Sequence, residues 1–188
     1  MKVTFIFLLF LIVTNAFADV TVKDIELKKI PNTEFKKISD LTKSDLIIIV
    51  AYGIECPILR KHTATLKKLV PELSKDNIPV YFVNLIKHTT NDELLDNIKS
   101  YDVGGDVYSP KSSAQLKDLG FTVLSEAALI RLSTNEILYK GAINNQITLD
   151  LTRPAATEHY LQDAVKSVLA KSAVKIPSTK TFGCEITY

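Results

Sequence analysis

The residues of this sequence best suited to carry out chemistry are its two cysteines. Cys56 follows an apolar run and stands directly before Pro57, whereas Cys184 lies near the C-terminus. Proline suits the first turn of a helix, so we expect Cys56 at a helix start, where backbone N–H groups favour a thiolate. A thiolate is both a nucleophile and a metal ligand, although a buried cysteine can also be an inert small residue. The Cys-Pro pair favours a functional Cys56.

Several roles are open to Cys184, which lies in a polar segment. It could take part in exchange with Cys56, form a permanent structural disulfide with it, share a soft ion such as Cu(I) with it, or bond another chain. A stretch of about twelve extended residues reaches up to about 40 Å, which is comparable to the width of a domain of this size. We therefore expect the two thiols to meet, and we expect Gly183 to permit a close backbone approach.

The three histidines are weaker candidates for a role at Cys56. Six residues turn a helix through about 600°, so we expect His62 to point away from Cys56 and to lie on the surface. His88 follows a central strand and could approach Cys56. His159 is expected to be exposed. Two cysteines also fall short of the four ligands that a structural zinc site usually takes.

The charged neighbours of Cys56 act in opposite directions. Arg60 lies one turn further along the expected helix and either supports a thiolate or is simply solvated. Glu55 would oppose a thiolate at close range. The pair Asn144–Asn145 and the polar loop that runs to Arg153 are expected at the surface, where the loop could border the site.

Length and charge narrow the class of protein. The chain has 188 residues, of which 46% are hydrophobic, and its net charge is +2. This length favours one domain with an ordinary core. The nearly balanced charge predicts no basic face and therefore no nucleic-acid partner.

The N-terminus has the pattern of a secretory signal peptide. Lys2 is a short positive region, residues 3–13 are almost wholly apolar, and Ala16-Phe17-Ala18 matches an A-x-A cleavage site. We expect cleavage after Ala18 and a mature chain from Asp19, in the periplasm or outside the cell. An uncleaved anchor is the alternative, although the apolar run is short for a membrane span. No other segment could cross a membrane, so no stable insertion is expected after cleavage.

The order of expected elements predicts an α/β domain. Residues 45–52 and 79–86 are continuous apolar runs, typical of strands buried on both faces, and residues 57–75 between them have helical spacing. A helical crossover makes these two strands parallel. Residues 127–132 and 137–140 predict an antiparallel hairpin. The remaining expectations are an edge strand within 19–40, a capped helix from Thr90 to Tyr101, a strand over 106–109, and helices over 111–119 and 155–172.

With Cys56 between its first central strand and helix, this order resembles the thioredoxin-like superfamily. The segments IIIVAYGIECPILRKHTATLKKL, VYFVNLI and LGFTVLSEAALIRLSTNEILYKGAINN resemble the redoxin branch, which includes TlpA-like proteins and peroxiredoxins. GCEI near the end resembles a Gly-Cys-x-Ile tail of some bacterial redoxins. The resemblance covers about residues 40–188. It implies a thioredoxin-like fold, with a mixed central sheet and helices on both faces.

Three departures separate the chain from active members of that superfamily. Leu59 stands where C-x-x-C proteins carry their second cysteine. Ser125 stands where members usually have a cis-proline facing the reactive cysteine. Gly53 replaces the threonine of peroxiredoxins, and their catalytic arginine has no counterpart, which makes a peroxidase doubtful.

The sequence therefore predicts a signal peptide over residues 1–18, a thioredoxin-like domain over 19–172 and a tail over 173–188. The leading hypothesis is an exported thiol–disulfide oxidoreductase, with Cys56 as nucleophile and Cys184 resolving the mixed disulfide. Its substrate would be a protein or small-molecule thiol or disulfide, and it would need no cofactor. The alternatives are a protein that binds copper or another soft metal and a non-catalytic interaction domain.

Overall fold

The computed structural model describes residues 21–54, 56–148 and 155–188. Its centre is a mixed sheet of seven strands in the order β2-β1-β5-β4-β3-β6-β7. The signal-peptide prediction, Glu55 and Arg153 lie outside the described residues. The described elements are η1 (Val22–Asp24), β1 (Glu26–Lys29), β2 (Lys36–Lys37), α1 (Ile38–Leu41), β3 (Leu46–Tyr52), α2 (Pro57–Lys75), β4 (Val80–Asn84), α3 (Asn91–Ser100), β5 (Val107–Pro110), α4 (Ala114–Asp118), β6 (Ala127–Arg131), β7 (Glu136–Gly141) and α5 (Tyr160–Leu169).

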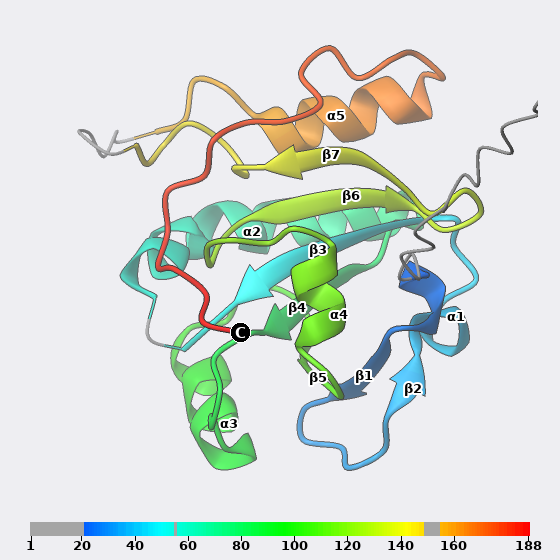
Figure 1. Ribbon diagram of the computed structural model, residues 1–188. Helices are drawn as coiled ribbons and strands as arrows, with labels where there is room; N and C mark the ends of the chain where they lie inside the picture. Colours follow the sequence, from blue (N-terminus) through cyan, green and yellow to red (C-terminus); the bar gives the residue numbers. More distant parts are fainter. Residues whose placement is uncertain (1–20, 55, 149–154) are drawn as a thin grey trace, which may run out of the picture.

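The centre of the sheet confirms the expected topology. β3 pairs in parallel with β4, and β6 pairs antiparallel with β3 and with β7. Residues 47–52 of β3 are all buried, as their β-branched apolar run predicted. In Figure 1, α2 lies behind the sheet and α4 in front of it, so helices cover both faces. Gln162 of α5 donates to Glu72 of α2 over 3.1 Å, which places α5 beside α2.

Three peripheral expectations need correction. β1 pairs with both β2 and β5, so β1 is an inner strand and the two-residue β2 forms the edge. α5 begins only at Tyr160, because Asn145 accepts the backbone N–H groups of Thr157 and Glu158 and holds that stretch in an irregular connection. Asn144 is 1% exposed rather than at the surface. Its Oδ1 accepts the N–H of Gln146, whereas its buried Nδ2 has no hydrogen-bond partner.

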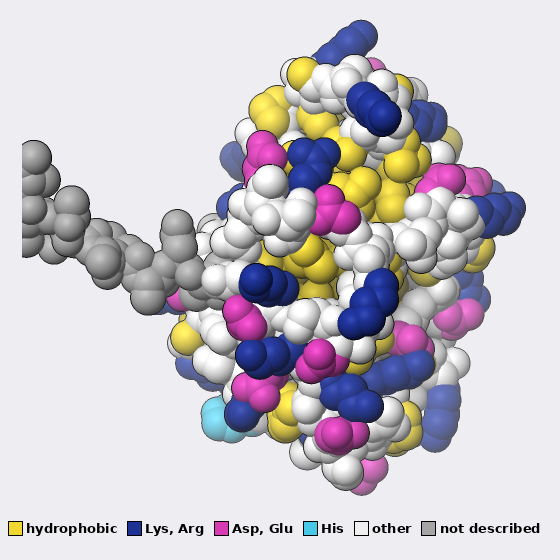
Figure 2. Space-filling view, turned by 90° about the vertical axis from the view of Figure 1, so that its right-hand side faces the viewer, with side chains coloured by type: hydrophobic (Ala, Val, Ile, Leu, Met, Phe, Trp, Pro, Cys, Tyr) yellow, Lys and Arg dark blue, Asp and Glu magenta, His cyan; other side chains and the backbone are white. Residues whose placement is uncertain are grey.

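The tail lies against the body of the domain. In Figure 1 it leaves α5, passes the ends of β7 and β6, and finishes beside the end of β3. Figure 2 shows the side that carries the β6–β7 turn, where side chains of both charge signs are interspersed with hydrophobic ones. None of the helices in the described ranges has the length and apolar character that crossing a bilayer needs.

Candidate active site at Cys56 and Cys184

Cys56 lies directly before α2, in the turn that follows the buried strand β3. It is the N-cap residue, and its Sγ accepts the backbone N–H of Leu59 over 3.5 Å. Pro57 occupies the first helical position, where the absence of an N–H costs nothing. The side chain of Cys56 is completely buried. A thiolate there would receive the N–H of Leu59 and the partial positive charge of the helix start.

The turn before Cys56 is held by two side chains that converge on one carbonyl. Ile54 O accepts Nη2 of Arg60 over 3.0 Å and Nδ2 of Asn97 over 3.2 Å. The guanidinium of Arg60 also lies 4.4 Å from the ring centre of Tyr101. Arg60 is exposed, as the solvated alternative expected, and its charge is also engaged with a backbone carbonyl and an aromatic ring. Its contacts fix the path of the chain into Cys56.

Gly53 packs closely against the site. A β-carbon on Gly53 would lie 2.6 Å from Leu124 Cδ1 and 2.7 Å from Ile86 Cδ1. A threonine in this position would need both side chains to move.

The tail forms an isolated antiparallel β-bridge with the segment before Ser125. Leu124 N donates to Cys184 O over 2.8 Å, and Ile186 N donates to Thr122 O over 3.0 Å. Val123 and Glu185 form the bridge between these two bonds. The tail thus reaches the active-site end of the sheet through backbone pairing, which no sequence motif signals.

Gly183 makes the close approach that was expected of it. A β-carbon on Gly183 would lie 2.0 Å from the carbonyl oxygen of Leu124 and 3.3 Å from Ser125 Oγ. No larger residue fits there unless backbone moves. The expectation of a close backbone approach is confirmed.

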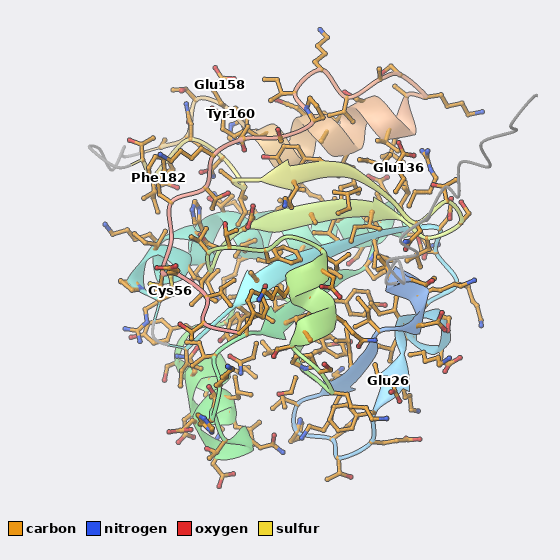
Figure 3. The ribbon with its side chains drawn as sticks, viewed as in Figure 1. Glu26, Cys56, Glu136, Glu158, Tyr160 and Phe182 are labelled. Carbon is orange, nitrogen blue, oxygen red and sulfur yellow. The ribbon has the colours of Figure 1, made fainter. Side chains whose placement is uncertain are left out.

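The side chains of Cys56 and Cys184 are in contact. Both are free thiols, and the Cys184 thiol is a hydrogen-bonding partner of Cys56. Burial, the largest cause, together with the hydrogen bond and the charge of Cys56, raises the pKa of Cys184 to about 11. Cys184 therefore keeps its proton at neutral pH and can donate it to a Cys56 thiolate. Figure 3 labels Cys56 on the side of the molecule along which the tail, with Phe182, descends.

Ser125 is more than a replacement for a proline. Its backbone N–H donates to Ala51 O over 2.8 Å, and its Oγ donates to Phe182 O over 3.3 Å. Its φ is +73°, a left-handed conformation that non-glycine residues rarely adopt. Ile30–Pro31 is the cis peptide bond of the described chain, so the bond before Ser125 is trans. Ser125 therefore ties the tail to the end of β3.

The burial of His62 differs from what the sequence predicted. His62 is only 4% exposed, so its predicted surface position is wrong. Cys56 caps the helix and is not part of its periodic face, whereas His62 shares the core-facing stripe with Leu59 and Leu66. Burial lowers the pKa of His62 to about 4. His159 is exposed as expected.

A cavity of about 490 Å³ lies beside Cys184. It is lined by residues 85–88, which follow β4, by residues 184–187 of the tail, and by Leu124. His88 is therefore on the cavity wall, with a φ of +62°. Cys184 is the more accessible thiol of the pair, because it is only partly buried whereas Cys56 is fully buried. The described residues contain no group of three or more His, Cys, Asp or Glu side chains arranged to hold a metal ion.

Comparisons with solved structures identify the architecture. A hypothetical protein from Sinorhizobium meliloti 1021 superposes with a TM-score of 0.76 at 16% identity, covering 90% of this chain and 93% of that one. A thioredoxin-like protein from Aeropyrum pernix gives 0.56 at 15% identity, covering 77% and 89%. A thiol:disulfide interchange protein from Bacteroides sp. gives 0.53 at 13% identity, covering 62% and 75%.

These likenesses establish the fold alone. No protein-family model matches the chain, and no curated protein matches it. The seven-stranded mixed sheet, with Cys56 at the start of the helix that follows β3, agrees with the architecture of these neighbours. The chain therefore has the thioredoxin-like fold, with its second thiol carried by the C-terminal tail.

Proposed function

We propose that this protein is an exported thiol–disulfide oxidoreductase whose redox centre is the pair Cys56 and Cys184. The observation that supports this most directly is the contact between the two thiols, which are 128 positions apart (184 − 56) in the sequence. One thiol is placed at a helix start and accepts a backbone N–H. The other keeps its proton and can donate it to the first.

The chemistry needs only the two sulfurs and a substrate. In the reduced form, one protein thiolate attacks a substrate disulfide and releases one substrate thiol, which leaves a mixed disulfide. The second protein thiolate then attacks the protein sulfur of that mixed disulfide and releases the other substrate thiol. The protein ends as the Cys56–Cys184 disulfide, and two electrons have passed to the substrate. In this cycle Cys56 is the nucleophile that the helix start stabilises.

The comparisons support this class of reaction without specifying it. The neighbour from Bacteroides sp. is described as a thiol:disulfide interchange protein. The present chain lacks an adjacent second cysteine, and we propose that Cys184 supplies it. Export is part of the same proposal, because a disulfide-based cycle suits an oxidising compartment. N-terminal sequencing of the secreted protein should begin at Asp19, and a chain that still begins at Met1 would contradict it.

A soft-metal site is the second candidate, because two touching thiols could also hold Cu(I) in a near-linear arrangement. Oxidation and metal binding compete for the same sulfurs, so one sample can separate them. The purified protein should be assayed for copper and mapped by non-reducing mass spectrometry after an acid quench. Bound copper in stoichiometric amount with both thiols free would favour the metal site.

The decisive test of the oxidoreductase is reversible exchange in the native state. Mild oxidation should produce one intramolecular Cys56–Cys184 disulfide, and dithiothreitol should reduce it without denaturant. Cys56→Ser and Cys184→Ser variants should each lose catalysed reduction of a model disulfide. A bond that is reduced only after unfolding would be structural. If both thiols stay free under mild oxidation and no metal is bound, the redox proposal is wrong.

A further inference from the structure

The two sulfurs of the proposed redox pair differ sharply in access. Cys56 is fully buried and in contact with Cys184 of the tail, whereas Cys184 is partly exposed and lines the cavity of about 490 Å³. An incoming sulfur can therefore approach Cys184 from the cavity without any movement of the tail. It can approach Cys56 only after the tail has left residues 122–124.

The cavity itself has the size and the lining of a small-molecule site. Its volume lies in the range of ordinary ligand pockets. Leu85 and Leu124, both at most 3% exposed, supply apolar surface at its inner side. Lys87 and Glu185, both exposed, bring opposite charges to it from two different segments, the β4–α3 connection and the tail. His88 adds a titratable donor or acceptor beside Lys87.

Resting on the proposed function, we infer that the cavity binds a small amino-acid or peptide thiol, and that this thiol exchanges with the protein disulfide at Cys184. The carboxylate of such a thiol would face Lys87, and its ammonium group would face Glu185. Its methylene group would lie against the leucines. In this half-reaction, which reduces the oxidised protein, Cys184 carries the mixed disulfide with the small thiol and Cys56 leaves as the thiolate. The reduced Cys56 is then the nucleophile that attacks the disulfide of the substrate in the other half of the cycle.

The exchange balances with two equivalents of the thiol, RSH. The first thiolate attacks Sγ of Cys184, the bond between the two protein sulfurs breaks, and its electron pair goes to Cys56. The product is RS–S–Cys184 with a Cys56 thiolate. A second thiolate attacks the mixed disulfide, which gives RSSR and a Cys184 thiolate that takes a proton from water. Two thiols are oxidised, and one protein disulfide is reduced.

The leaving groups agree with this direction of attack. Burial and Cys56 raise the pKa of Cys184 to about 11, so a Cys184 thiolate is expelled with difficulty. Cys56 leaves towards the N–H of Leu59, which already donates to its sulfur. Attack at Cys184 therefore releases Cys56, whose thiolate receives the N–H of Leu59. Attack at Cys56 would instead release Cys184, which holds its proton more tightly.

The first measurement is the position of the mixed disulfide. Oxidised full-length protein is mixed with L-cysteine, quenched in acid after increasing short times, denatured, and labelled with N-ethylmaleimide before peptide mapping. We expect cysteine bound to Cys184 and maleimide bound to Cys56. Cysteine bound to Cys56 would overturn the inference while leaving the proposed function intact. Absence of any reduction by thiols in the native state would overturn both.

The second measurement tests recognition in the cavity. Lys87→Ala and Glu185→Ala should each slow reduction by L-cysteine about two- to five-fold, as expected for exposed charge pairs. Reduction by the uncharged 2-mercaptoethanol should not change in either variant. Lys99→Ala, which removes an exposed lysine of α3 that does not line the cavity, is the matched control. Equal slowing with both thiols, or no slowing with either, would show that the cavity does not select the charged thiol.

Discussion

The carbonyl oxygen of Leu124 occupies the space that a side chain on Gly183 would need. The separation of 2.0 Å to an added β-carbon is far below van der Waals contact. Gly183→Ala must therefore displace the tail from residues 122–124. The displacement breaks two backbone hydrogen bonds, each worth about 1 kcal/mol, so the population of the open form should rise roughly 30-fold. We expect native-state alkylation of Cys56 to accelerate by that order, as measured by mass spectrometry.

Ser178→Ala is the control for this experiment, because Ser178 is an exposed residue of the same tail. In the Ser178→Ala variant, Cys56 should be alkylated at the wild-type rate. If Gly183→Ala also leaves Cys56 unreactive, the tail is not what covers that thiol.

Removal of Cys56 should make Cys184 more acidic. The hydrogen bond and the charge of Cys56 both contribute to the raised pKa of Cys184, although burial is the largest cause. In the Cys56→Ala variant the pKa of Cys184 should fall from about 11 but stay above the ordinary value of 9.0, because burial remains. Thiolate absorbance against pH would measure it, with the urea-unfolded variant as the reference. An unchanged midpoint would mean that the two thiols do not interact in solution.

Ser125→Pro, which introduces the proline that thioredoxin-like proteins usually carry at this position, should destabilise the fold. Proline requires a φ near −65°, whereas Ser125 has +73°, and proline removes the N–H that Ser125 donates to Ala51. We expect the free energy of unfolding to fall by about 3 kcal/mol or more. Ser125→Gly accepts the positive φ but loses the bond to Phe182, so it should stay within about 1 kcal/mol of the wild type. Urea titrations would compare them, and a Ser125→Pro variant of wild-type stability would contradict this account.

The central elements could be predicted from sequence because their signals are local. The β-branched run over 45–52, the Cys-Pro pair and the apolar spacing over 57–75 each indicate one structure without long-range information. The Thr90 capping box is equally local, and the structure contains it as predicted. Gly183 could be singled out because only a residue without a side chain allows such an approach.

The errors come from positions whose environment is set by distant parts of the chain. Asn144 is buried by tertiary packing, which a polar pair in a loop does not reveal. The left-handed Ser125 and the pairing of residues 184–186 with 122–124 likewise depend on contacts between remote segments. The cavity beside Cys184 exists only because of that pairing, so no motif could have indicated it.

His62 should make the protein lose stability in mild acid. It is 4% exposed, its Nδ1 has no hydrogen-bond partner, and burial lowers its pKa from 6.5 to about 4. Above pH 6.5 the imidazole is neutral in both states and has no pH-dependent effect. As the pH falls from 6.5 to 4, His62 is protonated in the unfolded chain but stays neutral in the folded one. The free energy of unfolding therefore falls by about 3 kcal/mol in total. Below pH 4 both states are protonated and the loss is complete.

His62→Leu should remove this loss, whereas the control His159→Gln, which alters an exposed histidine, should keep it. Urea unfolding at several pH values would measure the difference, and the same decline in His62→Leu would show that another group causes it.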